Sequence, residues 1–222
     1  WMEVGEVSEW EGTGRNVKIH QTIKARELWD LITYCATYSA EPGIFFLDNA
    51  NEMTNAQAYG QKVVATNPCG EQPLTPYAVC NLAAINLANM VNKKTKTVDF
   101  DKLAAVVRAS VRFQDNVIDA TPYFFEKNEQ QAKGERRVGL GVMGLADLLI
   151  YCEKVYGSEE GNRLVDQVFG KIAITAYQTS IELAKEKGSF PFLVGKTTEE
   201  TMLLRQRFIE SGYMKKMPES IR

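Results

Sequence analysis

The most unusual segment of the chain, residues 66–74, reads Thr66-Asn67-Pro68-Cys69-Gly70-Glu71-Gln72-Pro73-Leu74. Its two prolines and its glycine prevent a helix and discourage strand pairing, so the sequence predicts a loop with a fixed path. If the backbone is extended, alternate side chains face the same way, and Asn67, Cys69 and Glu71 project towards one space. These groups suit chemistry on a sugar, because a thiol exchanges a hydrogen atom and a carboxylate takes a hydroxyl proton. A solvated surface turn with an inert thiol remains the alternative.

On both sides of this loop, the spacing of apolar residues predicts helices over about 23–39, 100–120, 158–188 and 197–211. The second helix should stop at Thr121-Pro122, and the third should run from an N-cap at Ser158 to Gly188. Its expected buried stripe comprises Val165, Val168, Phe169, Ile172, Ala176 and Leu183. Short strands are expected at 44–47, 62–65 and 84–90. The alternation indicates an α/β fold but leaves open whether the sheet closes into a barrel.

Composition bounds the class of protein. The chain has 222 residues, of which 45% are hydrophobic and 24% charged, and its net charge is −2. No internal repeat or linker divides it, so we expect a single partial domain over residues 1–222. Its charge offers no basic field for nucleic acid, and no apolar run is long enough for a membrane helix. The four cysteines are widely spaced and no signal peptide is visible, which predicts a cytoplasmic protein.

Four segments resemble, in the same order, the large catalytic subunits of ribonucleotide reductases. They are residues 24–29, residues 41–48, the run Asn-Pro-Cys-Gly-Glu-Gln-Pro-Leu at 67–74 with 76–77 and 80–82, and the Arg-Arg-x-Gly-x-Gly-x-x-Gly block within 136–147. The resemblance covers nearly the whole chain. It implies a helix-rich part of a ten-stranded α/β barrel, with residues 67–74 as its active-site finger loop. The chain would be the middle portion of that barrel.

The resemblance also implies residue roles. Cys69 would form the thiyl radical that takes the ribose 3′ hydrogen, Glu71 would be the base for the 3′ hydroxyl, and Asn67 would bind substrate hydroxyls. Pro68 and Gly70 would complete the substrate-binding loop. Cys80 would be one of two thiols that reduce the substrate and end as a disulfide, with its partner outside this chain.

The sequences of the finger loop and of residues 44–51 are most similar to those of reductases that use adenosylcobalamin. This resemblance implies that cofactor and an external dithiol reductant such as thioredoxin. The alternative is a radical supplied by a separate metal-containing subunit. No metal ligand set is expected in the chain itself, because its cysteines form no close pair and His20 is its one histidine.

The chain opens at Trp1, so we expect a piece of a longer protein. The phosphate-binding loop, the partner thiol and the allosteric regions should lie in upstream and downstream segments. The chain alone should therefore be inactive, and the complete enzyme should be a homodimer that binds a ribonucleotide, but no nucleic acid or membrane. A non-catalytic assembly or nucleotide-binding module that retains the fold is the alternative function.

Other motifs receive simpler interpretations. Residues 139–144 match G-x-G-x-x-G, but charged residues precede them where a dinucleotide site has an apolar strand. These glycines should instead allow close packing between a strand and the helix after it. Cys35 and Cys152 are expected in the core. Arg136 and Arg137 should pair with carboxylates such as Glu135 or Asp147, with a phosphate contact as the alternative.

Overall fold

The computed structural model describes residues 12–14, 18 and 21–222 of the chain, which form two compact units, residues 1–45 and 46–222. The first unit contains α2 (Ala25–Ser39), which confirms the helix predicted over 23–39. None of the residues of α2 is fully buried, and Cys35 is half-buried, so its predicted core position is wrong. The apolar stripe of α2 predicts burial, but α2 is the one full helix among the described residues of this unit, and none of these residues forms a second helix that packs on it.

The second unit carries the remaining described elements, where η denotes a 3₁₀ helix. They are α3 (Leu47–Met53), η1 (Asn55–Tyr59), β1 (Ala65–Thr66), β2 (Pro73–Leu74), β3 (Leu82–Asn86), η2 (Leu87–Met90), β4 (Val91–Asn92), β5 (Thr97–Val98), α4 (Phe100–Ala120), α5 (Glu126–Glu135), β6 (Gly139–Met143), α6 (Leu145–Tyr151), α7 (Glu159–Lys187), η3 (Pro191–Leu193), α8 (Thr198–Glu210) and η4 (Gly212–Lys216). The unit is therefore helix-rich with short strands, as an α/β fold predicts.

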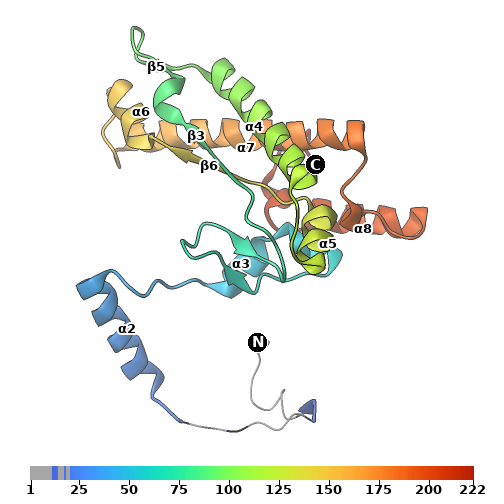
Figure 1. Cartoon of the computed structure of the whole chain (residues 1–222). Coiled ribbons are helices and arrows are strands. Elements are labelled where there is room, and N and C mark those ends of the chain that lie inside the picture. Colours follow the sequence, from blue (N-terminus) through green and yellow to red (C-terminus); the bar gives the residue numbers. More distant parts are fainter. Residues whose placement is uncertain (1–11, 15–17, 19–20) are drawn as a thin grey trace. The chain divides into compact units, whose positions relative to one another are not determined.

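The strands pair two by two. β1 with β2 and β4 with β5 are antiparallel, whereas β3 and β6 run parallel in the register Leu82↔Gly139 to Asn86↔Met143. Parallel strands need a long crossover, which α4 and α5 provide here (Figure 1). The ten-stranded barrel is not closed within the described residues, because β3 and β6 are the one parallel pair that they contain.

The long helices begin and end where local chemistry predicts. In α4, the side chain of Asp99 accepts a hydrogen bond from the Lys102 backbone at 2.9 Å. At the start of α7, the Ser158 hydroxyl accepts one from the Gly161 backbone at 3.0 Å. Gly188 ends α7 with a φ of 90°, which favours glycine. These bonds satisfy backbone groups that a helix end leaves unpaired.

The main core lies between β3, η2, α4, α6 and α7, and Figure 1 shows α4 crossing α7 beside the β3–β6 pair. Its buried members are Ile85, Leu87, Met90, Leu103, Val107, Val111, Leu148, Leu149, Cys152, Val168, Ile172 and Leu183. Each fully buried leucine contributes about 2 kcal/mol to folding by leaving water. Cys152 is buried as predicted, but Phe169 of the expected α7 stripe is 42% exposed.

The predicted strands are only partly present. Residues 44–46 form no regular element, and Leu47 begins α3 instead. Of the strand expected at 62–65, only Ala65 belongs to β1. The run 84–90 divides at Asn86, because its side chain accepts a hydrogen bond from the Ala88 backbone at 3.1 Å and caps η2. No helix in the described part of the chain has both the length and the apolar character needed to span a membrane.

Candidate active site in the loop between β1 and β2

The loop of residues 67–72 is a hairpin turn between two antiparallel strands. The Gly70 backbone donates to the Asn67 carbonyl at 3.0 Å, and Gly70 has a φ of 83°. The Gln72 backbone donates to Asn67 Oδ1 at 2.9 Å. The expectation of an extended loop is therefore wrong, because the Asn67 carbonyl and carboxamide draw the chain back on itself. A space shared by Asn67, Cys69 and Glu71 does not follow from alternation, and it stays a prediction.

The groups expected to react are accessible. Cys69 and Glu71 are exposed and Asn67 is half-buried, so a ligand can reach the turn. Cys80 is also exposed and lies two residues before β3. Within the described residues, the Nδ2 group of Asn67 makes no hydrogen bond, which leaves it able to donate to a ligand oxygen. The turn thus presents a thiol, a carboxylate and an amide donor to its surroundings.

Both strands below the turn are held by side chains. On the incoming side, Asn51 of α3 donates to the Val63 carbonyl at 3.0 Å and accepts from the Val63 backbone at 2.8 Å. On the outgoing side, Arg137 donates from Nη1 to the Pro73 carbonyl at 3.0 Å. Side chains from α3 and from the segment before β6 therefore fix the base of the loop.

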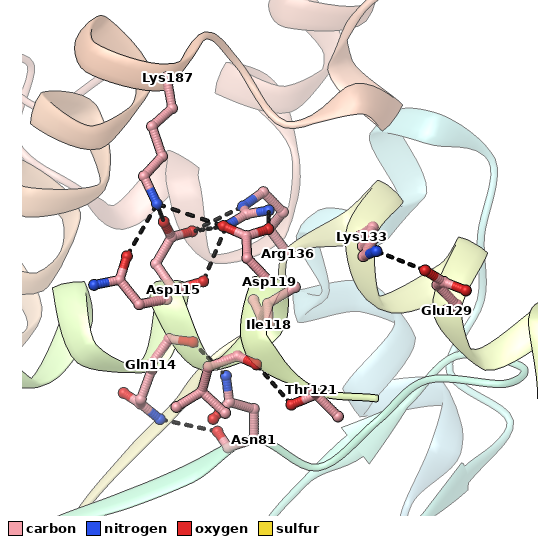
Figure 2. Close-up of polar contacts among 12 residues, drawn as sticks. Asn81, Gln114, Asp115, Ile118, Asp119, Thr121, Glu129, Lys133, Arg136 and Lys187 are labelled. Atoms are coloured by element: carbon pink, nitrogen blue, oxygen red, sulfur yellow. Dashed lines mark hydrogen bonds and ion pairs between the residues drawn. The ribbon is translucent and has the colours of Figure 1, made fainter. Parts of the chain in front are cut away.

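The backbone that follows Cys80 is held by Gln114 of α4, which is fully buried. Gln114 Nε2 donates to the carbonyls of Asn81 and Gly139, both at 2.9 Å, and Asn81 Nδ2 donates back to the Gln114 carbonyl at 2.8 Å. Figure 2 shows the Asn81–Gln114 pair. The sequence interpretation missed Gln114, although it continues the apolar stripe of Leu103, Val107 and Val111, which is a detectable signal.

The glycine-rich block forms β6 itself and the turn after it. A Cβ on Gly139 would lie 1.7 Å from Gln72 Nε2, so the Gln72 side chain would have to move if Gly139 carried a side chain. Gly144, with a φ of 72°, approaches Asn86 Oδ1. The predicted close packing between a strand and the helix after it is wrong in its partner, because Gly139 and Gly144 approach Gln72 and the β3–η2 segment instead. The block is a strand and not a phosphate-binding loop.

Arg136 and Arg137 are both engaged by carboxylates. Arg137 pairs with Glu135, as predicted, but neither arginine pairs with Asp147. Arg136 donates to Asp115 and to Asp119, each at 2.8 Å (Figure 2). These partners leave little capacity for a phosphate.

Asp115 is the centre of a cluster of charged side chains that also contains Asp119, Arg136 and Lys187. Lys187 of α7 donates to its Oδ2 at 2.6 Å, opposite Arg136 (Figure 2). Burial acts to raise the pKa of Asp115, but hydrogen bonds from Arg136 and Lys187 outweigh burial and hold its pKa below the ordinary value. The cluster therefore joins α4, α7 and the start of β6 with a carboxylate that stays ionised.

A cavity of about 870 Å³ is lined by this cluster and by residues of α3, η1, α4, α5, β6, α7, η3 and α8. It contacts the base of the loop at Pro73 but includes neither Cys69 nor Glu71. Within the described residues, no three His, Cys, Asp or Glu side chains gather to hold a metal ion. His20 lies outside the described residues.

Comparisons with known proteins give the relatives of this chain. The chain is 42% identical over 186 residues to a vitamin B12-dependent ribonucleoside-diphosphate reductase of Thermoplasma acidophilum. It is 43% identical over 177 residues to the enzyme of the same name from Mycobacterium tuberculosis, and 33% identical over 192 residues to a ribonucleoside-diphosphate reductase large subunit of Danio rerio.

These alignments cover 84%, 80% and 85% of the chain but only 24%, 25% and 24% of the relatives, so the chain spans about a quarter of their length. The sequence profile described as ribonucleotide reductase, barrel domain, matches residues 6–219. The chain therefore belongs to the ribonucleotide reductase family and lies within its barrel domain.

Proposed function

We propose that this chain is part of the catalytic subunit of a ribonucleotide reductase, which replaces the 2′ hydroxyl of a ribonucleotide with hydrogen. The observation that carries the proposal is the exposed thiol of Cys69 on a hairpin turn. Hydrogen bonds from Asn51 and Arg137 fix the chain on the two sides of this turn. Because the relatives with 42% and 43% identity are named diphosphate reductases, we infer a ribonucleoside diphosphate as substrate.

In this proposal, the Cys69 thiyl radical takes the hydrogen atom from C3′, forming an S–H bond and leaving a carbon radical. Glu71 takes the 3′ hydroxyl proton, while Asn67 Nδ2 holds a substrate hydroxyl. The 2′ oxygen leaves as water. Cys80 and a thiol from another segment supply two electrons and two protons and form a disulfide, and Cys69 returns its hydrogen to C3′. An external dithiol such as thioredoxin then reduces the disulfide.

The radical source that we propose is adenosylcobalamin, since the relatives with the higher identities are named vitamin B12-dependent. The tip of the turn is open to a bound group: Cys69 is exposed, and an added Cβ at Gly70 would meet nothing within 4 Å. When bound, the cofactor would supply the radical that converts the thiol to a thiyl. A separate metal-containing subunit is the alternative source, and dependence of turnover on added cobalamin separates the two.

The proposed enzyme needs segments beyond this one, because the relatives are about four times longer. We propose that residues 1–222 are a single partial domain, the middle of a ten-stranded barrel, and that the complete subunit forms a homodimer in the cytoplasm. The alternative is a non-catalytic module that keeps the fold. The presence of Asn67, Cys69, Glu71 and Cys80 together supports catalysis, since a module without activity has no need of all four.

The test is Cys69→Ser in the complete reductase that contains this segment. Deoxyribonucleotide formation should fall to background, because a serine hydroxyl does not form a radical where a thiol does. Cys35→Ser is the matched control, since it removes a thiol from α2, outside the loop, and should leave turnover unchanged. Wild-type turnover by Cys69→Ser would remove Cys69 from the mechanism and favour the non-catalytic module.

A further inference from the structure

The loop that carries Cys69 has a weak stem of its own. β1 and β2 contain two residues each, and an isolated two-stranded ribbon is marginal in water. Within the turn, hydrogen bonds of Asn67 to Gly70 and Gln72 fix its shape but not its place in the molecule. The position of Cys69 therefore depends on what holds the stem.

One group that fixes the stem is the buried ion pair of Glu135 and Arg137 at the end of α5. The Glu135 side chain is 4% exposed, and its carboxylate accepts hydrogen bonds from Arg137 Nε and from the Tyr59 hydroxyl, both at 2.9 Å. A buried carboxylate is costly unless its oxygens are paired in this way. Burial and the negative charge of Glu135 raise the pKa of Tyr59, so its hydroxyl remains a donor. The carboxylate is thus held firmly in place.

The ion pair reaches the loop through two contacts. The Arg137 guanidinium binds Glu135 through Nε and Nη2, while Nη1 donates to the Pro73 carbonyl at 3.0 Å. Thr75 donates to Glu135 Oε2 at 3.3 Å and is itself 2% exposed. Pro73 and Thr75 follow Cys69 by four and six residues, so the outgoing strand is bound to a rigid point.

We propose that Arg137 is a positioning residue for the reaction of Cys69, acting through the Pro73 carbonyl. This inference rests on the proposed function of Cys69. A shift of about 1 Å at a reacting group can lower the rate about 10²-fold. The hydrogen bond from Arg137 to Pro73 positions the loop, so its loss should lower kcat more than it weakens substrate binding. In this inference Arg137 acts on the loop backbone, since its guanidinium is bonded to Glu135 and to the Pro73 carbonyl.

The test is Arg137→Lys in the complete reductase. Lysine keeps the positive charge beside Glu135 but lacks the planar fork that binds Glu135 and Pro73 together. We expect kcat to fall about tenfold or more, with KM for the ribonucleotide within about twofold, as expected for a misplaced reacting group. We also expect the rate of Cys69 alkylation by iodoacetamide, followed by mass spectrometry, to change by about threefold or more. A displaced loop alters the exposure of its thiol, on which the rate of alkylation depends.

Arg136→Lys is the matched control, because it makes the same change one residue away in a side chain bonded to Asp115 and Asp119. It should leave kcat and Cys69 alkylation unchanged even if it lowers the Tm. Wild-type kcat and alkylation in folded Arg137→Lys would overturn the inference. If that variant does not fold, Thr75→Val tests the same anchor, and unchanged Cys69 alkylation there would overturn it. Failure of the proposed function is seen separately, as turnover by Cys69→Ser.

Discussion

Cys69 and Cys80 are both exposed thiols, yet their surroundings differ. Cys69 occupies a turn whose tip is open, whereas Cys80 precedes a backbone that Gln114 fixes through Asn81. This difference fits the two roles proposed for them, a radical centre at Cys69 and a reducing thiol at Cys80. The two roles can be separated by experiment, because radical formation does not require the second thiol.

At the residue scale, we therefore predict that Cys80→Ser abolishes multiple turnovers in the complete reductase, since the two-electron reduction loses one of its thiols. Radical formation at Cys69 should survive. It is measured as hydrogen exchange between solvent and the 5′ position of added adenosylcobalamin. Loss of this exchange, with Cys69 intact, would assign Cys80 a structural role instead.

Among the secondary-structure elements, α4, α7 and the segment before β6 are joined by the cluster around Asp115. Asp115 and Asp119 lie on α4, Lys187 ends α7, and Arg136 precedes β6 (Figure 2). The Asp115 side chain is 11% exposed. Removing one charge from such a cluster leaves the remaining charges without the opposite charge that offsets the cost of their burial. The packing of α4 on α7 thus has a polar end beside its apolar core.

We predict that Asp115→Asn lowers the free energy of unfolding by about 3 kcal/mol at neutral pH, measured by urea unfolding. The pKa of Asp115 is lowered in the folded state, so its contribution is present above the ordinary value of 3.8 and is lost as pH falls towards the folded pKa. The wild type should therefore lose stability below about pH 4 more steeply than the variant.

Arg112→Gln is the control for this prediction, because the Arg112–Glu186 pair is about half exposed and joins the same two helices. Its cost should be much smaller than that of Asp115→Asn, because water screens an exposed ion pair. Equal effects of the two substitutions would show that the Asp115 cluster is no more than a surface ion pair.

At the scale of the whole molecule, the chain is a partial structure in comparison with its relatives, which are about four times longer. Within the described residues, Leu82 on β3 and Met143 on β6 are more than half exposed. Exposed apolar side chains on a strand pair of this kind favour association. The second unit is thus suited to pairing with further strands.

We predict that the 222-residue chain by itself binds a ribonucleoside diphosphate with a Kd of about 1 mM or weaker, as judged by calorimetry. Arg136 and Arg137 are engaged by carboxylates, and the glycine block forms a strand, so neither offers donors to a phosphate. Supplying the remaining reductase segments should restore binding and turnover. Micromolar binding by the chain alone would contradict this view.

Features that depend on neighbouring residues could be predicted from the amino-acid sequence. The bounds of α4 and α7 follow from caps such as Ser158 and from the periodicity of their apolar residues, which act within one or two turns. The two prolines and Gly70 likewise specify a loop. The same reasoning missed α5, because its sequence is polar all round and shows no apolar stripe.

The position of the loop and the side chains that hold it depend on long-range contacts, which no local pattern predicts. Arg137 meets Pro73 across 64 residues, and Gln114 meets Asn81 across 33. No local pattern encodes these partners, because a side chain's hydrogen-bond partner depends on which segments the fold brings together. Phe169 shows the same limit, since it has helical spacing but no neighbouring element covers it fully. Local interactions set the elements, and long-range packing set the geometry of the proposed site.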